Sequence, residues 1–87
     1  MTARATPATT EVAIVTGGGS GFGEGISKRF ALEGAKVVVN DLVDAAAERV
    51  AREIVAAGGK ARAVPGDVSK DADVSHLVAT ALAVYGD

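Results

Sequence analysis

Short apolar runs alternate with longer stretches of mixed character along the chain. Residues 12–15 form one such run, residues 36–41 contain three consecutive valines at 37–39, and residues 61–64 form a weaker segment that includes Arg62. An uninterrupted run of valines is typical of a strand that is buried on both faces. In the stretches that follow each run, apolar residues return every three or four positions, which is the period of an α-helix. The pattern therefore predicts three strands, each followed by a helix.

Each predicted helix carries an apolar stripe and has recognisable ends. Gly34 closes the first helix and Gly58-Gly59 the second, because glycine adopts the left-handed conformation that ends a helix. Asp44 is the expected N-cap of the second helix. The inward-facing stripes that we expect are Phe22, Ile26 and Phe30 in the first helix, Val50, Ile54 and Ala57 in the second, and Val74, Leu77, Val78, Ala81 and Tyr85 in the third.

Strands that alternate with helices indicate a parallel sheet with right-handed crossovers. The predicted fold class is α/β: a partial Rossmann (doubly wound) fold of order β-α-β-α-β-α, with three parallel strands in the order 3-2-1. We assign residues 12–87 to this fold, as a domain half that is truncated before a fourth strand, and residues 1–11 to a flexible N-terminal tail. The strand at 12–15 would then have a free edge, through which we expect self-association.

The composition restricts the class of protein. Of the 87 residues, 48% are hydrophobic and 23% are charged, as in a globular domain. A net charge of −2 means that there is no basic excess to neutralise the phosphates of a nucleic acid, and no apolar run approaches the roughly 20 residues that a membrane span needs. The absence of cysteine excludes a disulfide framework and a thiolate metal site. It also fits a reducing compartment, and we therefore expect a cytoplasmic protein.

Glycine is concentrated where the first predicted strand meets the first predicted helix. Six glycines lie between residues 17 and 25. Glycine adopts the positive φ angles of a tight turn without steric cost, and the absence of side chains lets a phosphate approach the backbone. The helix that follows offers free N–H groups and the positive end of its dipole to such an anion. The junction predicts a phosphate-binding loop, with a plain flexible turn as the alternative.

The spacing of these glycines distinguishes between the known phosphate-binding loops. Residues 18–23 satisfy the first part of a Walker loop, but Glu24 stands where that loop needs a lysine. A kinase loop would be followed by a strand rather than a helix, and the strict GxGxxG pattern fails in every register. The pattern that fits is TGxxxGxG, formed by Thr16, Gly17, Gly21 and Gly23.

This motif strongly resembles that of the short-chain dehydrogenase/reductase family, in which TGxxxGxG follows the first strand. The resemblance extends over residues 12–87. It implies that an acidic residue at the end of the second strand holds the adenosine ribose of NAD(P), and that an Asp-Val pair after the third strand contacts the adenine. Asp41 matches the first, and Asp67 with Val68 the second. The implied cofactor-binding residues are Gly17, Gly19, Ser20, Gly21, Phe22, Gly23, Asp41, Leu42, Asp67 and Val68.

The residues around Asp41 favour NAD over NADP. The Asp41 carboxylate would accept hydrogen bonds from both ribose hydroxyls and would repel the 2′-phosphate of NADP. NADP-preferring members of the family that the chain resembles usually carry a basic residue where this sequence has Ser20, and no arginine immediately follows Asp41. Turn formation is the alternative role of Asp41, and also of Asp67, which follows a Pro-Gly pair.

No catalytic residue is assigned within the chain. The resemblance implies that hydride transfer uses a Tyr-x-x-x-Lys pair and a serine. Tyr85 is the only tyrosine, and the lysine position, four residues after it, would lie beyond Asp87. We expect Tyr85 to pack in the apolar stripe, and His76, the only histidine, to lie on a polar helix face. No cluster of residues has the spacing of a metal site, and none is predicted.

These features predict the dinucleotide-binding part of an NAD(P)-dependent oxidoreductase, which transfers a hydride between a nicotinamide cofactor and an alcohol or carbonyl substrate. The expected partners are NAD and, in the full-length protein only, a small substrate that the sequence does not identify. We do not expect catalysis from these 87 residues alone. Two alternatives stay open: a free-standing nucleotide-binding or interaction module, and a phosphate-binding loop unrelated to NAD, which Glu24 and Asp41 disfavour.

Overall fold

The computed structural model describes residues 11–85 of the chain. It contains β1 (Val12–Val15), α1 (Gly21–Leu32), β2 (Lys36–Val39), α2 (Asp44–Ala56), β3 (Lys60–Ala63) and α3 (Asp71–Tyr85), in the predicted order. The strands form one parallel sheet in the order β1-β2-β3, which is 3-2-1 from the other edge. The predicted fold class is therefore confirmed. Apart from Glu11, the residues assigned to a flexible tail lie outside the described part.

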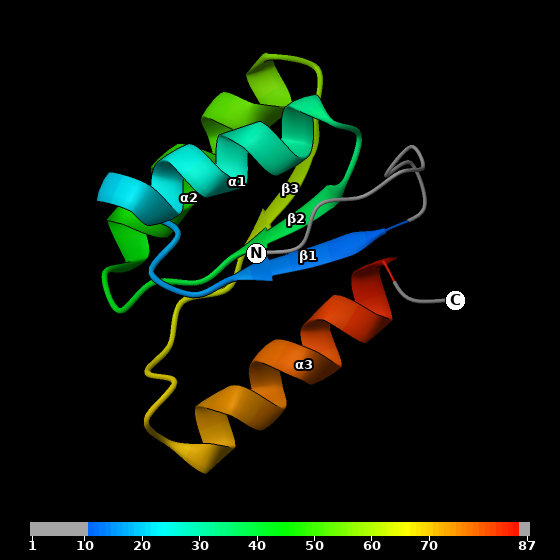
Figure 1. The fold of residues 1–87 in the computed structure, drawn as a ribbon. Coiled ribbons are helices and arrows are strands. Elements are labelled where there is room, and N and C mark those ends of the chain that lie inside the picture. The colour runs from blue at the N-terminus through cyan, green and yellow to red at the C-terminus, as the bar shows by residue number, and fades with distance from the viewer. Residues whose placement is uncertain (1–10, 86–87) are drawn as a thin grey trace.

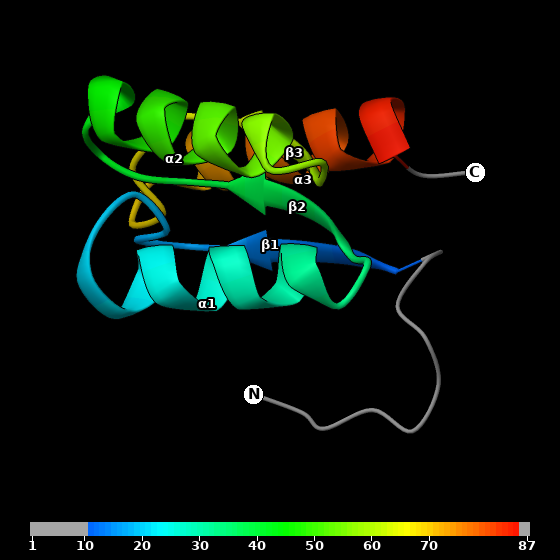
Figure 2. The same ribbon diagram turned by 90° about the horizontal axis from the view of Figure 1, so that it is seen from above.

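Helices cover both faces of the sheet. α1 and α2 lie on one face, and α3 lies on the other (Figures 1 and 2). The valines of β2 explain why both faces are covered, because successive side chains of a strand point to opposite faces. Val37 and Val39 pack in the core beneath α1 and α2, whereas Val38 packs against α3, and all three are fully buried. The valine run thus has the two-sided burial that the sequence predicts.

The stripe predicted for α1 is correct at two of its three positions. Ile26 and Phe30 pack against the larger core, but Phe22 is 93% exposed. Phe22 lies in the first turn of α1, and this turn extends past the carboxyl ends of the strands (Figures 1 and 2). Its side chain therefore has no sheet beneath it within the described residues.

The stripe predicted for α3 is too wide. Leu77 and Ala81 are buried and Tyr85 is partly buried, but Val74 and Val78 are exposed. Within residues 11–85, the core on this side of the sheet contains only four buried residues, which are Val38, Val64, Leu77 and Ala81. α3 therefore contacts the sheet along one narrow line, and the residues beside that line point away from it.

α2 differs from the prediction at both ends. Val43, rather than Asp44, is its N-cap residue, and Asp44 is the first residue of the helix. The carboxylate of Asp44 still lies in the first turn, where the helix dipole favours a negative charge. At the other end the helix stops at Ala56, so Ala57 is its C-cap and is exposed instead of facing the core.

The helix ends carry the glycine signals that the sequence predicts. Gly34 and Gly58, which follow α1 and α2, have φ angles of +93° and +95°, in the left-handed region. Within residues 11–85, no helix combines the length and the apolar character that crossing a membrane requires.

Candidate functional site

Three loops leave the sheet at the carboxyl ends of its strands. They cover residues 16–20 after β1, 40–43 after β2 and 64–70 after β3. Because the carboxyl ends of parallel strands all lie on the same side of the sheet, these loops converge. Open α/β sheets bind their ligands beside these carboxyl ends. A hollow of about 320 Å³ lies there, and small-molecule sites occupy roughly 300–1,000 Å³. It is lined by Thr16, Gly17, Asn40, Asp41, Leu42, Gly66, Asp67 and Val68.

The hollow brings together five of the ten residues for which a cofactor-binding role is expected, namely Gly17, Asp41, Leu42, Asp67 and Val68. The others lie in the rest of the first loop and in the first turn of α1: Gly19, Ser20, Gly21, Phe22 and Gly23. The structure thus places all ten on two adjoining features, the hollow and the amino end of α1.

The glycines of the first loop serve different physical purposes. Gly17 and Gly21 have φ angles of +66° and +55°, a conformation that other residues rarely adopt. Gly23 lies within α1, and a Cβ atom there would collide with the carbonyl oxygen of Gly17. A Cβ atom on Gly19 would lie 2.8 Å from Ala46 of α2. These glycines therefore shape the turn and let the loop pack closely against both helices.

The amino end of α1 offers hydrogen-bond donors without acceptors. Among residues 11–85, the N–H groups of Gly21, Phe22 and Gly23 have no acceptor, and the first bond of the helix runs from the N–H of Glu24 to the carbonyl of Ser20. Ser20 is the N-cap residue, but its side chain makes no capping hydrogen bond. Free N–H groups and the positive end of the helix dipole together favour an anion.

Asp41 connects the end of β2 to the glycine loop. Its Oδ2 accepts a hydrogen bond from the N–H of Gly19 at 3.1 Å, and its Oδ1 accepts one from the N–H of Val43 at 3.0 Å. The bond to Val43 is the turn-forming role that the sequence left open. A carboxylate has about four lone-pair sites, so both oxygens can still accept hydrogen bonds from a ligand.

Asp67 also forms a turn at its own position. Its Oδ1 accepts hydrogen bonds from the backbone N–H and the hydroxyl of Ser69, at 2.9 and 2.7 Å. These two donors lower the pKa of the Asp67 carboxyl below its usual value. Within the described residues Oδ2 of Asp67 has no hydrogen-bond partner. The exposed side chains of Leu42 and Val68 add apolar surface to the same hollow.

Two buried polar residues that hold the site together were not singled out from the sequence. Asn40 donates from Nδ2 to the carbonyls of Val64 and Gly66, at 3.0 and 3.3 Å, and so ties the loop after β3 to the end of β2. The hydroxyl of Ser27 donates to the Gly23 carbonyl within α1 at 2.8 Å and lies 3.5 Å from the carbonyl oxygen of Gly18 in the glycine loop. A polar residue directly after three valines was the available signal for Asn40.

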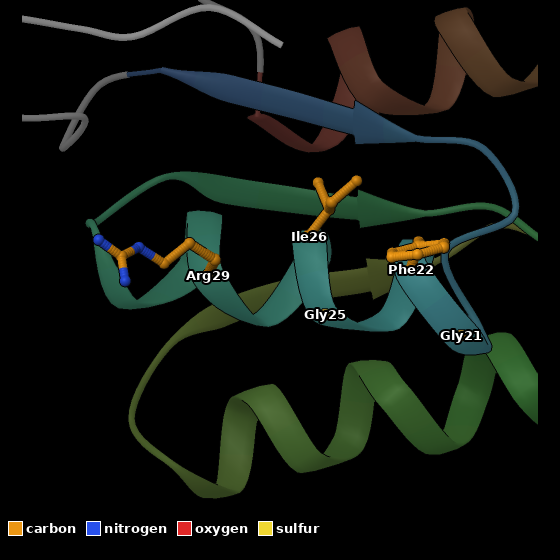
Figure 3. Close-up of a pocket in the computed structure, with 5 residues that line it drawn as sticks. All are labelled: Gly21, Phe22, Gly25, Ile26 and Arg29. Carbon is orange, nitrogen blue, oxygen red and sulfur yellow. The ribbon is translucent and has the colours of Figure 1, made fainter.

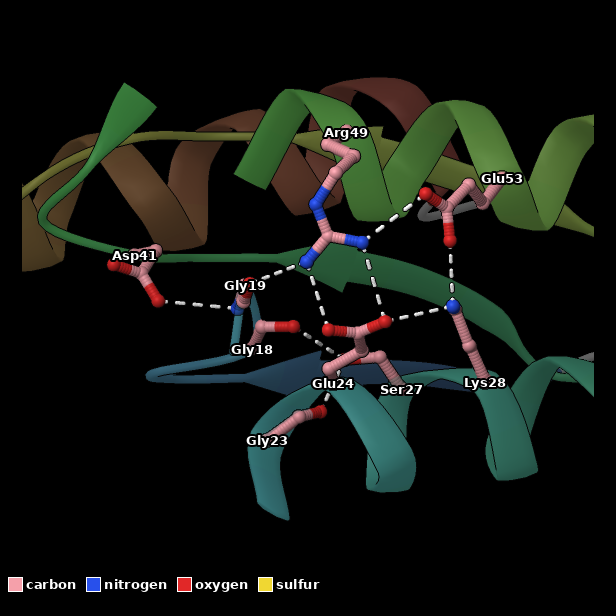
Figure 4. A network of polar contacts seen from close by, with 9 residues as sticks. All are labelled: Gly18, Gly19, Gly23, Glu24, Ser27, Lys28, Asp41, Arg49 and Glu53. Carbon is pink, nitrogen blue, oxygen red and sulfur yellow. Dashed lines mark hydrogen bonds and ion pairs between the residues drawn. The ribbon is translucent and has the colours of Figure 1, made fainter. Parts of the chain in front are cut away.

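A network of four charged side chains, formed by Glu24, Lys28, Arg49 and Glu53, joins α1 to α2 beside the glycine loop (Figure 4). Nζ of Lys28 lies 2.7 Å from Oε2 of Glu24 and 2.6 Å from Oε1 of Glu53. Nη2 of Arg49 lies 2.8 Å from Oε1 of Glu24, and its Nη1 lies 3.1 Å from Oε2 of Glu53. Hydrogen bonds from Arg49 and Lys28 lower the pKa of Glu24 from its ordinary value of 4.5 to about 2. We refer to these residues as the α1–α2 network.

A second hollow, of about 530 Å³, lies on the surface of α1 (Figure 3). Its lining residues are Gly21, Phe22, Gly25, Ile26 and Arg29. It is larger than the first hollow, but every lining residue belongs to one helix, and the loops after β2 and β3 do not reach it. The convergence of three loops and their polar groups makes the smaller hollow the candidate site.

The remaining titratable candidates do not form a second site. Tyr85 is partly buried against the core beneath α3, and this burial raises its pKa. His76 is exposed on α3. Within residues 11–85, no group of three or more histidine, cysteine or acidic residues could hold a metal ion.

Comparisons with known proteins identify relatives of the chain. The short chain dehydrogenase family profile matches residues 11–87. The 2,5-dichloro-2,5-cyclohexadiene-1,4-diol dehydrogenase of Sphingobium indicum is 46% identical over 76 residues, which are 87% of this chain and 30% of that protein. Tropinone reductase-like 1 of Erythroxylum coca is 45% identical over 76 residues, which are 87% of this chain and 27% of that protein.

Solved structures also resemble the described fold. A hydroxysteroid dehydrogenase from Escherichia coli has a TM-score of 0.89 and 38% identity, over 92% of this chain and 34% of that one. A 3-ketoacyl-(acyl-carrier-protein) reductase from Brucella melitensis, complexed with NADH, has a TM-score of 0.81 and 55% identity, over 88% of this chain and 30% of that one. The chain thus spans between 27% and 34% of the length of these four proteins.

Proposed function

The chain belongs to the short-chain dehydrogenase family, and from this membership we propose that its described residues bind the adenosine and pyrophosphate parts of NAD. The observation that carries the proposal is the carboxylate of Asp41, which lies at the end of β2 and accepts the N–H of Gly19 from the glycine loop. A ribose-binding acid is expected at this position in a dinucleotide-binding fold.

The residues present fit a dinucleotide at its pyrophosphate. The N–H groups of Gly21, Phe22 and Gly23 have no acceptor within residues 11–85, and a pyrophosphate would provide acceptors for them. Around Gly17 and Gly21, no atom beyond the glycine, its chain neighbours and the adjoining helix backbone lies within 4 Å of the position that a Cβ would occupy, so the backbone is open to a close approach. A side chain at either position would narrow that approach.

The residues of the hollow fit the adenosine. The Asp41 carboxylate accepts hydrogen bonds from the ribose hydroxyls. Leu42 and Val68 supply apolar surface for the flat adenine ring, and Asp67 accepts a hydrogen bond from the amino group of the adenine. An apolar hollow with a few polar groups is the usual composition of a small-molecule site. Asp67 then acts both as a turn former through Oδ1 and as a ligand-binding group through Oδ2.

We propose that NAD is preferred over NADP. The 2′-phosphate of NADP would meet the negative charge of Asp41, and like charges that lie close together in a partly buried site repel. Ser20, at the rim of the loop, provides no positive charge to compensate. The NADH complex of the Brucella reductase shows that a relative with this fold binds the non-phosphorylated cofactor.

For the whole protein we propose hydride transfer between the nicotinamide cofactor and an alcohol or carbonyl compound. The bound cofactor supplies the group that gives or accepts the hydride. Residues 11–85 bind and orient its adenosine end, and we assign none of them a catalytic role. The cytoplasm remains the location that we propose.

The test is a calorimetric titration of the intact protein with NAD and, separately, with NADP. We expect the wild-type protein to bind NAD more tightly. Replacing Asp41 by alanine should weaken NAD binding by at least roughly ten- to hundredfold, which is the loss expected for a single charge-assisted hydrogen bond of about 1.5–3 kcal/mol. Asp44→Asn, which changes an exposed carboxylate three residues further along, is the matched control and should bind NAD like the wild type. Equal affinity of the wild-type protein for NAD and NADP would refute the role of Asp41.

A further inference from the structure

The peptide groups of Gly19 are held from two sides. Its N–H donates to Oδ2 of Asp41 at 3.1 Å, and its carbonyl oxygen accepts a hydrogen bond from Nη2 of Arg49 at 3.2 Å (Figure 4). The loop also packs directly against α2 here, since an added Cβ on Gly19 would meet Ala46. Gly19 is thus contacted both from the end of β2 and from α2.

The same guanidinium group also binds the first turn of α1. Nη2 and Nη1 of Arg49 donate to the two carboxylate oxygens of Glu24, at 2.8 and 3.2 Å. Such a two-point arginine–carboxylate pair fixes orientation as well as distance. Glu24 directly follows the three residues of α1 whose N–H groups lack acceptors within the described chain. Arg49 therefore joins the loop and the amino end of α1, the two parts of the proposed pyrophosphate site.

From this geometry we infer that Arg49 is a positioning residue of the cofactor site, which holds the Gly19 peptide on Asp41 and fixes the glycine loop relative to α1. The inference rests on the proposed binding of NAD. Arg49 need not touch the cofactor, because it acts through the Gly19 carbonyl and Glu24. A loop that is already ordered costs less to organise when the ligand binds, so Arg49 contributes to affinity by keeping the loop in place.

The remaining members of the α1–α2 network separate this role from a general effect on stability. Glu53 accepts a hydrogen bond from Nη1 of Arg49 at 3.1 Å and pairs with Lys28, so its polar contacts within residues 11–85 are to the network and not to the glycine loop. Arg52 is exposed one turn further along α2 and has no ion pair within the described residues. Glu53→Gln therefore weakens the α1–α2 network without releasing the glycine loop. Arg52→Met removes a surface arginine that contacts neither the network nor the loop.

The experiment measures NADH binding by fluorescence titration of the intact protein and deuterium exchange of the loop at residues 16–23. We expect Arg49→Met to raise the NADH dissociation constant about tenfold, and to speed exchange in the cofactor-free loop. Glu53→Gln and Arg52→Met should leave both readouts close to the wild type. Arg49→Lys keeps the charge but not the planar fork, and we expect its dissociation constant to lie between those of the wild type and Arg49→Met.

Two results overturn the inference alone, while NADH still binds the wild-type protein. One is unchanged affinity and loop exchange in Arg49→Met. The other is an equal loss of affinity in Glu53→Gln, which would mean that the network acts only through stability. Failure of the wild-type protein to bind NADH overturns the proposed function, and the inference with it, so the two failures are distinguishable.

Discussion

The backbone of Gly23 lies so close to the carbonyl group of Gly17 that no side chain fits between them. The contact brings the first turn of α1 against the loop that leads into it, and so places the free N–H groups of the helix beside the end of β1. Gly25, two residues further along the helix, faces open space instead. A single missing Cβ atom at position 23 thus determines how the amino end of α1 meets the loop.

Replacing Gly23 by alanine should therefore destabilise the protein and weaken NAD binding. Overpacking a close contact typically costs about 1–3 kcal/mol, and the atoms that the new methyl group would meet belong to the backbone of Gly17 and Gly18, which cannot rotate aside as a flexible side chain can. Gly25→Ala is the matched control: it adds the same methyl group to the same helix without a clash, and should stabilise the protein by about 0.5–1 kcal/mol. Chemical denaturation of both variants checks the sign of each change. Equal stability of the two variants would contradict the steric explanation.

Among the secondary-structure elements, the strands were the most predictable from the sequence. Three consecutive valines require burial on both faces, and the structure buries all three. The inward positions of α1 were predictable only where sheet lies beneath the helix, so Phe22 was misplaced. The periodic pattern contains no information about where the strands end relative to the helix.

The contacts between α1 and α2 could not be predicted in the same way. The sequence suggests pairs of opposite charge four residues apart within a helix, as between Glu24 and Lys28. The pairing of Arg49 with Glu24 joins residues 25 positions apart, and it exists only because two helices lie side by side over the sheet. The loop motif is local, so the sequence could indicate where its residues lie, and their role in binding stays a prediction. The groups that hold the loop come from distant parts of the chain and could not be predicted in this way.

The α1–α2 network makes stability depend on pH in a defined direction. The pKa of Glu24 falls from 4.5 to about 2 in the folded protein, and that of Glu53 is also lowered. A lowered pKa of a carboxyl contributes stability above its unfolded value, and the contribution is lost as the pH falls through the folded value. We therefore expect this part of the stability to be present above pH 4.5 and to disappear between pH 4.5 and about 2.

Glu24→Gln should flatten the decline of stability across that range. The introduced amide would carry no charge to lose, so the difference in stability from the wild type should shrink as the pH falls. Glu48→Gln, at an exposed position of α2 without an ion pair in the described residues, is the control and should follow the wild type. Urea denaturation at a series of pH values provides the measurement. Parallel curves for Glu24→Gln and the wild type would show that the network does not contribute.

At the scale of the whole molecule, β1 leaves one side of the sheet without a partner strand among the described residues. β1 pairs with β2 along one of its edges, and its other edge has no partner strand within residues 11–85. The side chains of Val12 and Ile14 in this strand are exposed. An apolar strand with an open edge is a template for pairing with another chain. The Sphingobium dehydrogenase and the Escherichia coli hydroxysteroid dehydrogenase match this chain over only 30% and 34% of their own length, so the comparison covers the same part of the fold.

The 87-residue polypeptide, expressed alone, should therefore self-associate through β1. A domain of this size buries only about 60–65% of its unfolded surface, so exposed apolar strand surface is a large fraction of the whole. Ile14→Lys places a charge beside the open edge and should shift the population towards monomer in sedimentation velocity runs, because lysine on an edge strand opposes pairing. Val55→Lys makes the same kind of change at an exposed position of α2, away from β1, and should leave association unchanged. If both variants shift the population equally, the added charge explains the effect and the open edge of β1 does not. If the wild-type polypeptide is monomeric at all concentrations, β1 does not act as a template for pairing.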